Sequence, residues 1–533
     1  MPRPHLPRSS GILLHISSLP GRFGIGDLGP AAWRFVDLLA RLKQTWWQML
    51  PLGPPAIAGC PYQCFSAMAG DPNLISPELL RQEGLITPHD LSGAQGDNEH
   101  VDFAAVTAMK CGLLSRAWEH FQGGAAPHLK LEFEEFRNAE AKWLGDFSLF
   151  MALRHAHGSR PWADWPRAMA FRKPVALRAA RRELAEPIAQ CEFAQFLFFR
   201  QLAGLRMHAA RAGIKLIGDM PIFVAGESAD VWSNPGQFQL DRDRRPKFVA
   251  GVPPDYFSKT GQRWGNPLYR WSAMKRDGFR WWIARAAMAL RQTDLVRIDH
   301  FRGLAACWSI PASAPTAELG RWVKSPGRQL LEVLQREFTS HVRPAHTGDG
   351  KTPAHLRGQD MGRPPIPRPS GLPFIAEDLG MITPDVEKLR DDFNLPGMRV
   401  LQFAFGGDAG NPFLPHNYPR NCIAYTGTHD NDTSAGWYKS LDPKTQKHVN
   451  DFTLGAARDP AAAFIRLAWS SVADVAIAPL QDVLGLGSEA RMNTPGLALG
   501  NWGWRVSKAA LGSRRFNLLQ ELTAIYAREA ANP

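Results

Sequence analysis

Short runs of apolar residues, rich in branched side chains and ending in polar or turn residues, recur along the chain. Such runs are typical of buried β-strands, although a short run can also be a buried helix segment. Eight segments fit this pattern: residues 11–15, 46–52, 214–220, 295–299, 374–377, 398–403, 423–426 and 475–479. Amphipathic patterns typical of helices lie between most of them, as at 31–42 and 384–393. This alternation predicts an α/β protein, specifically a (β/α)8 TIM barrel.

Two long segments interrupt the alternation. About 160 residues separate the second and third candidate strands, whereas loops in α/β units have roughly 2–6. Apolar residues at three-to-four spacing over 110–121, 129–154 and 192–211 predict a mostly helical insertion, at about 66–210. The second segment, 224–270, is rich in Gly, Pro, Tyr and Trp without periodicity. A long aromatic segment of this kind indicates an active-site loop region.

A proline-rich segment at 343–371 has few large apolar residues. Its composition predicts a flexible insertion. We expect the other parts of the 533-residue chain to build one catalytic barrel.

Composition narrows the class of protein. With 44% apolar and 21% charged residues, 18 Trp and 29 Phe, the chain is unlike disordered proteins. No window approaches the ~18 unbroken apolar residues of a membrane helix, and His15 interrupts the N-terminal apolar run, which is unlike a secretory signal. The six cysteines are scattered without metal-binding or CxxC spacing. We therefore expect free thiols and a cytoplasmic protein.

A net charge of +12 raises nucleic acid or an anionic surface as a partner. The basic residues are scattered, however, for instance along one helix face at Arg178, Arg181 and Arg182. This distribution favours a solvated surface, and neither a nucleic-acid nor a membrane partner is expected.

Gly24–Gly29 matches the GxGxxG pattern of dinucleotide-binding proteins. The preceding candidate strand ends near His15 rather than beside Gly24, and no acidic residue closes the 46–52 strand where a ribose would be held. An ordinary glycine-rich loop is the better interpretation.

Acidic residues follow three of the candidate strands. Arg297 and Asp299 project to the same side of one strand, because strand side chains alternate. Glu377 ends a second strand, and Asp430 follows a third. A structural Arg–Asp pair could cap a strand, but several carboxylates converging at one barrel face are costly and are what glycoside chemistry needs. We expect Arg297 to keep Asp299 ionised, which favours its use as a nucleophile.

With these residues in place, the chain resembles the 4-α-glucanotransferases, or amylomaltases, members of the α-amylase superclan that lack its usual C-terminal β-domain. The resemblance covers nearly the whole chain. The motifs that carry it lie at 17–21, 61–63 with 65–66, 218–224, 249–258, 262–267, 297–303, 376–380, 396–398, 425–433 and 487–493. Two positions depart from the usual pattern: Ile57 replaces an aromatic residue, and Leu304–Trp308 differs from the usual continuation.

The resemblance implies roles for individual residues. Asp299 would be the nucleophile, Glu377 the general acid/base, and Asp430 the carboxylate that holds sugar hydroxyls and stabilises the transition state. Substrate-binding or supporting roles fall to Tyr62, Asp219, Trp264, Asn266, Arg297 and His429. Tyr62 would form the floor of the donor subsite and Trp264 would serve the acceptor side; core packing is the alternative for both aromatics.

The sequence thus predicts a retaining transferase that moves an α-1,4-glucan segment from a maltooligosaccharide or starch-type donor to the 4-hydroxyl of another glucan or glucose, without a metal or organic cofactor. A hydrolase with the same carboxylates and a catalytically inactive glycan-binding protein are the alternatives. Transfer requires an oriented acceptor and poorly placed water. Tyr256, Phe257, Trp264 and Tyr269 are expected to form an apolar wall for this purpose.

Overall fold

The computed structural model describes residues 6–57, 59–92, 99–254, 258–339, 371–497 and 499–529. Its centre is a parallel sheet of eight strands in the order β10-β11-β12-β1-β2-β3-β6-β9. The strands are β1 (Ser9–Leu13), β2 (Trp46–Gln48), β3 (Lys215–Pro221), β6 (Leu295–Asp299), β9 (Phe374–Ala376), β10 (Gly397–Val400), β11 (Cys422–Tyr425) and β12 (Val475–Pro479). The Ala376 N–H donates to the Pro396 carbonyl at 2.9 Å and draws the two edge strands together. The predicted TIM barrel is confirmed.

The barrel interior is filled by side chains from alternate strand positions, as in other small barrels. They are Leu13, Trp46, Ile217, Leu295, Ile375, Met398, Val400, Ile423, Tyr425, Val475 and Ile477. Gly11 is needed where β1 passes β2, because a Cβ there would lie 2.4 Å from the Trp46 carbonyl oxygen. Since Leu295 points inward, Arg297 and Asp299 on the same strand also face the barrel axis, at its C-terminal end.

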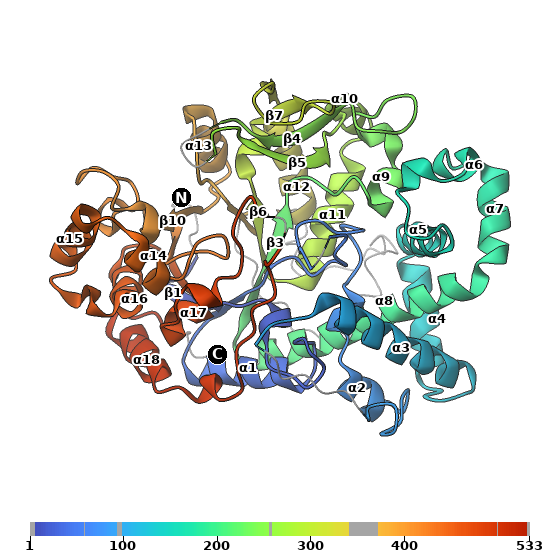
Figure 1. Ribbon diagram of the computed structural model, residues 1–533, viewed down its shortest axis with the longest axis horizontal. Helices are drawn as coiled ribbons and strands as arrows, with labels where there is room; N and C mark the ends of the chain where they lie inside the picture. Colours follow the sequence, from blue (N-terminus) through green and yellow to red (C-terminus); the bar gives the residue numbers. More distant parts are fainter. Residues whose placement is uncertain are drawn as a thin grey trace, which may run out of the picture.

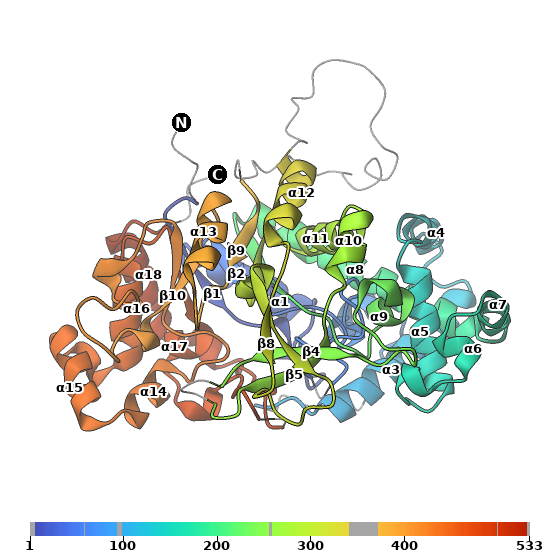
Figure 2. The ribbon, with the colours of Figure 1, turned by 90° about the horizontal axis from the view of Figure 1, so that it is seen from above.

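Helices and 3-10 turns fill the segment between β2 and β3. The helices are α2 (Pro77–Gln82), α3 (Phe103–Gln122), α4 (Leu129–Ala139), α5 (Leu144–Ala156), α6 (Arg167–Ala170), α7 (Pro174–Glu183) and α8 (Ala185–Arg211). Figures 1 and 2 show α3–α7 gathered at one end of the molecule. A buried ion pair, Lys110 Nζ to Asp27 Oδ2 at 3.2 Å, ties α3 to the loop after β1. That residues 66–210 form a separate subdomain stays a prediction.

The segment 224–270 is more regular than its sequence indicates. It holds α9 (Ala229–Ser233), β4 (Phe248–Val252) and β5 (Gln262–Pro267). With β7 (Ala306–Pro311) and β8 (Arg321–Lys324), these strands form an antiparallel sheet in the order β5-β4-β7-β8, seen at the top of Figure 1. Because β4 pairs with β7, which lies beyond β6 in the chain, local periodicity could not indicate the sheet. Of the proline-rich segment, 343–370 lies outside the described residues.

The remaining described helices surround the barrel. They are α1 (Pro30–Arg41), α10 (Trp271–Arg276), α11 (Arg280–Gln292), α12 (Gly327–Thr339), α13 (Pro384–Asp392), α14 (Ser434–Ser440), α15 (Pro443–Phe452), α16 (Pro460–Ser470), α17 (Leu480–Leu484) and α18 (Arg515–Ile525). Helices α14–α18 lie at the end opposite α3–α7 (Figures 1 and 2). No helix in the described part of the chain has the length and apolar character needed to cross a membrane.

An extended segment, residues 499–506, connects distant parts of the chain; we call it the C-terminal strap. Its backbone bonds join it to the helical insertion, where Val101 N–H donates to Gly503 O at 2.7 Å. They also join it to the loop after β1, where Val506 N–H donates to Ser18 O at 2.9 Å. The strap therefore connects three separate stretches of sequence beside the barrel.

Candidate active site

An ion-paired triad occupies the adjacent ends of β3 and β6. Asp219 and Arg297 are register partners on these neighbouring parallel strands. The Arg297 Nε and Nη2 atoms donate to Asp219 Oδ2 at 3.0 and 2.8 Å, and Nη2 also donates to Asp299 Oδ1 at 2.7 Å. One guanidinium thus serves two carboxylates, which is the geometry that a planar, multiply donating group permits.

In this triad a single cation, Arg297, faces two carboxyl groups. Although burial opposes its charge, Asp219 and Asp299 raise the pKa of Arg297 well above its usual range, so Arg297 stays cationic. For Asp299, burial raises the pKa well above its usual range; Arg297 opposes this, and Asp219 and Glu377 reinforce it. The expectation that Arg297 keeps Asp299 ionised is wrong as a net direction, because burial outweighs the cation, which Asp299 shares with Asp219, and further acids surround the site.

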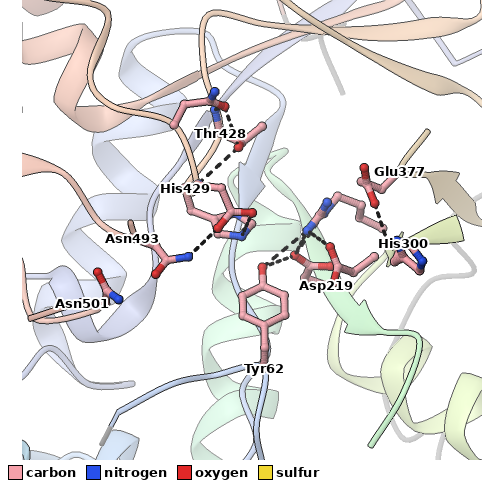
Figure 3. Close-up of polar contacts among 12 residues, drawn as sticks. Tyr62, Asp219, His300, Glu377, Thr428, His429, Asn493 and Asn501 are labelled. Carbon is pink, nitrogen blue, oxygen red and sulfur yellow. Dashed lines mark hydrogen bonds and ion pairs between the residues drawn. The ribbon is translucent and has the colours of Figure 1, made fainter. Parts of the chain in front are cut away.

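Glu377 directly follows β9 and is held by two backbone amides. His300 N–H donates to its Oε2 at 2.6 Å and Leu379 N–H to its Oε1 at 2.9 Å. His300 has a left-handed backbone, with φ of 53°, at the turn that leads its amide to the carboxylate (Figure 3). Burial outweighs these hydrogen bonds and the field of Arg297, and raises the pKa of Glu377 to about 7. This carboxyl group can therefore hold a proton near neutral pH.

Asp299 and Glu377 are both buried carboxyl groups with raised pKa values, and the charge of Glu377 raises that of Asp299. Between them they retain a proton at a pH where isolated carboxyl groups are both ionised. Arg297 ion-pairs directly with Asp299, at 2.7 Å. This contact favours the ionised form of Asp299 and opposes the rise that burial causes in its pKa.

The third carboxylate, Asp430, lies beyond β11 and is more open to solvent. Its side chain is 46% exposed, compared with 29% for Asp299. Asn493 Nδ2 donates to its Oδ1 at 2.6 Å, and Arg491 Nη2 donates to its backbone carbonyl at 2.8 Å. Asn493 and Arg491 belong to a motif noted in the sequence, but no role for either was predicted from it.

An aromatic group separates Asp430 from the triad. The Tyr62 hydroxyl donates to Asp219 Oδ2 at 2.6 Å, and its ring stacks on His429 with centroids 5.1 Å apart and planes inclined by 17° (Figure 3). Trp502 completes the group, with its ring 5.6 Å from that of Tyr62. Burial is the main cause that lowers the pKa of His429, so this ring is neutral at neutral pH. No pattern in the sequence indicated Trp502, because it lies on the strap and is remote from Tyr62 and His429 along the chain.

Two predicted residues come from β5. The half-buried Trp264 meets the His300 ring edge-on, with centroids 4.8 Å apart. Asn266 is buried; its Nδ2 donates to the Val224 carbonyl at 2.9 Å and its Oδ1 accepts from Gln63 at 3.0 Å. Both ends of this amide therefore hold neighbouring loops together.

The expected apolar wall is wrong at Tyr269. This residue is 1% exposed, and its hydroxyl donates to the Ile222 carbonyl at 2.7 Å. Its ring packs against Trp271, at a centroid distance of 4.9 Å, so Tyr269 is a core residue. The other two predicted wall residues, Tyr256 and Phe257, lie outside the described residues. Of the proposed wall, Trp264 is the residue that the structure places at the site.

Comparisons with known proteins identify the family of the chain. The sequence model of the 4-alpha-glucanotransferase family, glycoside hydrolase family 77, matches residues 14–510. A 4-alpha-glucanotransferase of Thermus thermophilus is 48% identical over 94% of this chain and 95% of its own length. One from Synechocystis is 45% identical over 98% of both chains. The amylomaltase of Streptococcus agalactiae, solved with acarbose, superposes with a TM-score of 0.89 at 36% identity, over 98% of this chain and 100% of the other.

Proposed function

Since the chain belongs to the 4-alpha-glucanotransferase family, we propose that its glucan transfer is carried out by Asp299 as nucleophile and Glu377 as general acid/base, with Asp430 holding the reacting sugar. The observation that carries this assignment is the uneven contact of Arg297. It pairs with Asp299 at 2.7 Å and opposes the rise that burial causes in the pKa of Asp299, while burial raises the pKa of Glu377 to about 7. One group is then ready to attack and the other to protonate.

The reaction proceeds in two displacements. Asp299 attacks the anomeric carbon of the donor, Glu377 gives its proton to the leaving oxygen, and the shortened glucan departs. The remaining glucan is then bonded to Asp299. In the second step Glu377, now ionised, takes the proton of an acceptor 4-hydroxyl as that oxygen displaces Asp299. Two inversions at the same carbon retain the α configuration, and Glu377 recovers its proton.

The aromatic and amide groups position the two sugars. We assign the donor sugar ring to Tyr62, whose hydroxyl is fixed on Asp219, and the hydroxyl groups of that sugar to Asp430. Trp264, beside His300, serves the acceptor. A ligand at this site is supported by the related Streptococcus agalactiae amylomaltase, which was solved in complex with acarbose. For Asn266 we propose an indirect role, through the position of β5.

We place this reaction in the cytoplasm. All six cysteines are free in the structure, although Cys60 and Cys64 lie only four positions apart. Free thiols at such spacing are typical of a reducing compartment.

A trapping experiment tests the two catalytic assignments. α-Glucosyl fluoride needs no protonation of its leaving group, so Glu377→Gln protein should react with it and accumulate a glucosyl adduct. Intact-mass measurement should show the added sugar, and peptide mapping should place it on Asp299. Asp299→Asn protein is the matched control and should form no adduct. An adduct on any other residue would refute the nucleophile.

A further inference from the structure

Trp502 contacts both aromatic partners of the site from the C-terminal strap. Its ring centroid lies 5.6 Å from that of Tyr62 and 6.0 Å from that of His429. The residue is 8% exposed, so its indole is almost wholly enclosed. Tyr62 and His429 are stacked on each other, and Trp502 packs against both rings. The three rings come from the loop after β2, the loop after β11 and the strap.

The backbone of Trp502 is held in an unfavourable conformation. Its φ is 68°, in the left-handed region that bulky residues rarely adopt. Such a conformation persists only where the surroundings fix it, and it is found preferentially at functional sites. Here the Trp502 N–H donates to the Met492 carbonyl at 2.7 Å. The preceding residue, Asn501, accepts from Thr494 N–H at 2.9 Å and donates to Leu497 O at 2.8 Å.

A chain of short contacts leads from this ring group to the nucleophile. The Tyr62 hydroxyl donates to Asp219 at 2.6 Å, Arg297 donates to Asp219 at 2.8 Å, and Arg297 donates to Asp299 at 2.7 Å. A rotation of the Tyr62 ring would therefore withdraw a donor from Asp219 and change how Arg297 is shared.

We propose that Trp502 is a positioning residue for glucan transfer, which fixes the Tyr62 and His429 rings and through Tyr62 the charge arrangement at Asp299. The inference rests on the proposed role of Tyr62 at the donor sugar. Trp502 itself need not touch the substrate. Its effect on the reaction comes from confining the rotation of Tyr62, whose ring would otherwise have free volume on the strap side.

The same strap supplies a control for simple core packing. Trp504 is 7% exposed and pairs with His100 in an antiparallel bridge. Within the described chain it makes no ring contact with Tyr62 or His429. Trp502 and Trp504 thus have nearly equal burial and the same backbone segment, but differ in contact with the site.

The test compares disproportionation of maltotriose by Trp502→Ala, Trp502→Phe and Trp504→Ala proteins, well below the lowest melting temperature. Misplacement of a reacting group by about 1 Å can cost roughly 10²-fold in rate, so Trp502→Ala should lower kcat by about 10–100-fold. KM should change less than kcat, and Trp502→Phe should recover most of the loss. Trp504→Ala should lower the melting temperature similarly and keep kcat near the wild-type value. If the Trp502→Ala protein does not fold, the Trp502→Leu protein is used in its place.

A double-mutant cycle with Tyr62→Ala identifies the route of the effect. Once Tyr62 is absent, Trp502→Ala should cause little further loss of kcat. The inference is overturned by equal losses in Trp502→Ala and Trp504→Ala, or by a Trp502→Ala loss that persists in full without Tyr62. A fully active Tyr62→Ala protein would instead refute the proposed role of Tyr62, and the inference with it.

Discussion

The backbone amide of His300 donates to Glu377 Oε2 at 2.6 Å, so the residue next to the proposed nucleophile binds the proposed acid/base directly. Two more backbone bonds join these strand ends: Phe301 N–H to Glu377 O, and Glu377 N–H to Ile298 O, both at 3.1 Å. The separation of Asp299 and Glu377 is therefore set by sheet hydrogen bonds between β6 and β9.

The pH dependence of transfer should reflect the ionisation of Glu377. Its pKa of about 7 is above the usual value, and the first step needs the protonated form. With maltotriose, kcat/KM should therefore fall as pH rises through about 7. Adduct formation with α-glucosyl fluoride should lack this alkaline decline, because fluoride leaves without a proton. An alkaline decline shared by both donors would exclude Glu377 as its source.

Removing the shared cation should damage both stability and rate. Arg297→Met leaves Asp219 buried without its ion pair; breaking a buried pair typically costs about 3–5 kcal/mol of folding free energy. Without Arg297 the pKa of Asp299 rises further, so the acidic limb of kcat should move to higher pH. Thermal unfolding and a pH–rate profile measure the two effects. Arg336→Met, on the exposed part of α12, is the control. An unmoved acidic limb would contradict the role assigned to Arg297.

Asn493 should matter through Asp430. Its Nδ2 donates to Asp430 Oδ1 at 2.6 Å, and hydrogen bonds to charged groups contribute about 1.5–3 kcal/mol. Because Asp430 is 46% exposed, solvent screening reduces this, and Asn493→Ala should lower kcat/KM by about tenfold. Asn450→Ala removes a comparable amide that bonds Tyr438 on the outer helices and should leave kcat/KM unchanged. Steady-state assays that find equal effects for the two variants would refute the assignment.

Trp264 should influence the choice between acceptor and water. Transfer from maltotriose keeps the number of reducing ends constant, whereas each hydrolysis adds one. Trp264→Ala removes the ring beside His300, so bound acceptor becomes less well oriented and water gains access. The ratio of new reducing ends to released glucose should rise above that of wild type. Trp33→Ala, at an unrelated ring stacked on His208, should leave the ratio as it was. An unchanged ratio for Trp264→Ala would show that this ring does not serve the acceptor.

The sequence located the barrel well because its strands are locally encoded. The expected segments 295–299 and 475–479 coincide with β6 and β12, and the others shift by a few residues. The three carboxylates could be located for the same reason, since Asp299 ends β6, Glu377 directly follows β9 and Asp430 lies in the loop after β11. Trp502 and the antiparallel sheet depend on contacts between remote segments, which local periodicity does not record. Tyr269 shows a related limit: an aromatic residue in a polar stretch looks exposed until its burial against Trp271 is known.

Because β1 lies between β12 and β2 in the barrel, the strands cannot all pair in the order in which they are synthesised. Ser9 pairs with Val475, so the first barrel strand acquires its second neighbour only after nearly the whole chain has been translated. At roughly 5–20 residues per second, that takes tens of seconds on the ribosome. During this interval the N-terminal strand has an unpaired edge, which is a site for mispairing with other chains. The barrel, and with it catalysis, cannot be complete before β12 has emerged.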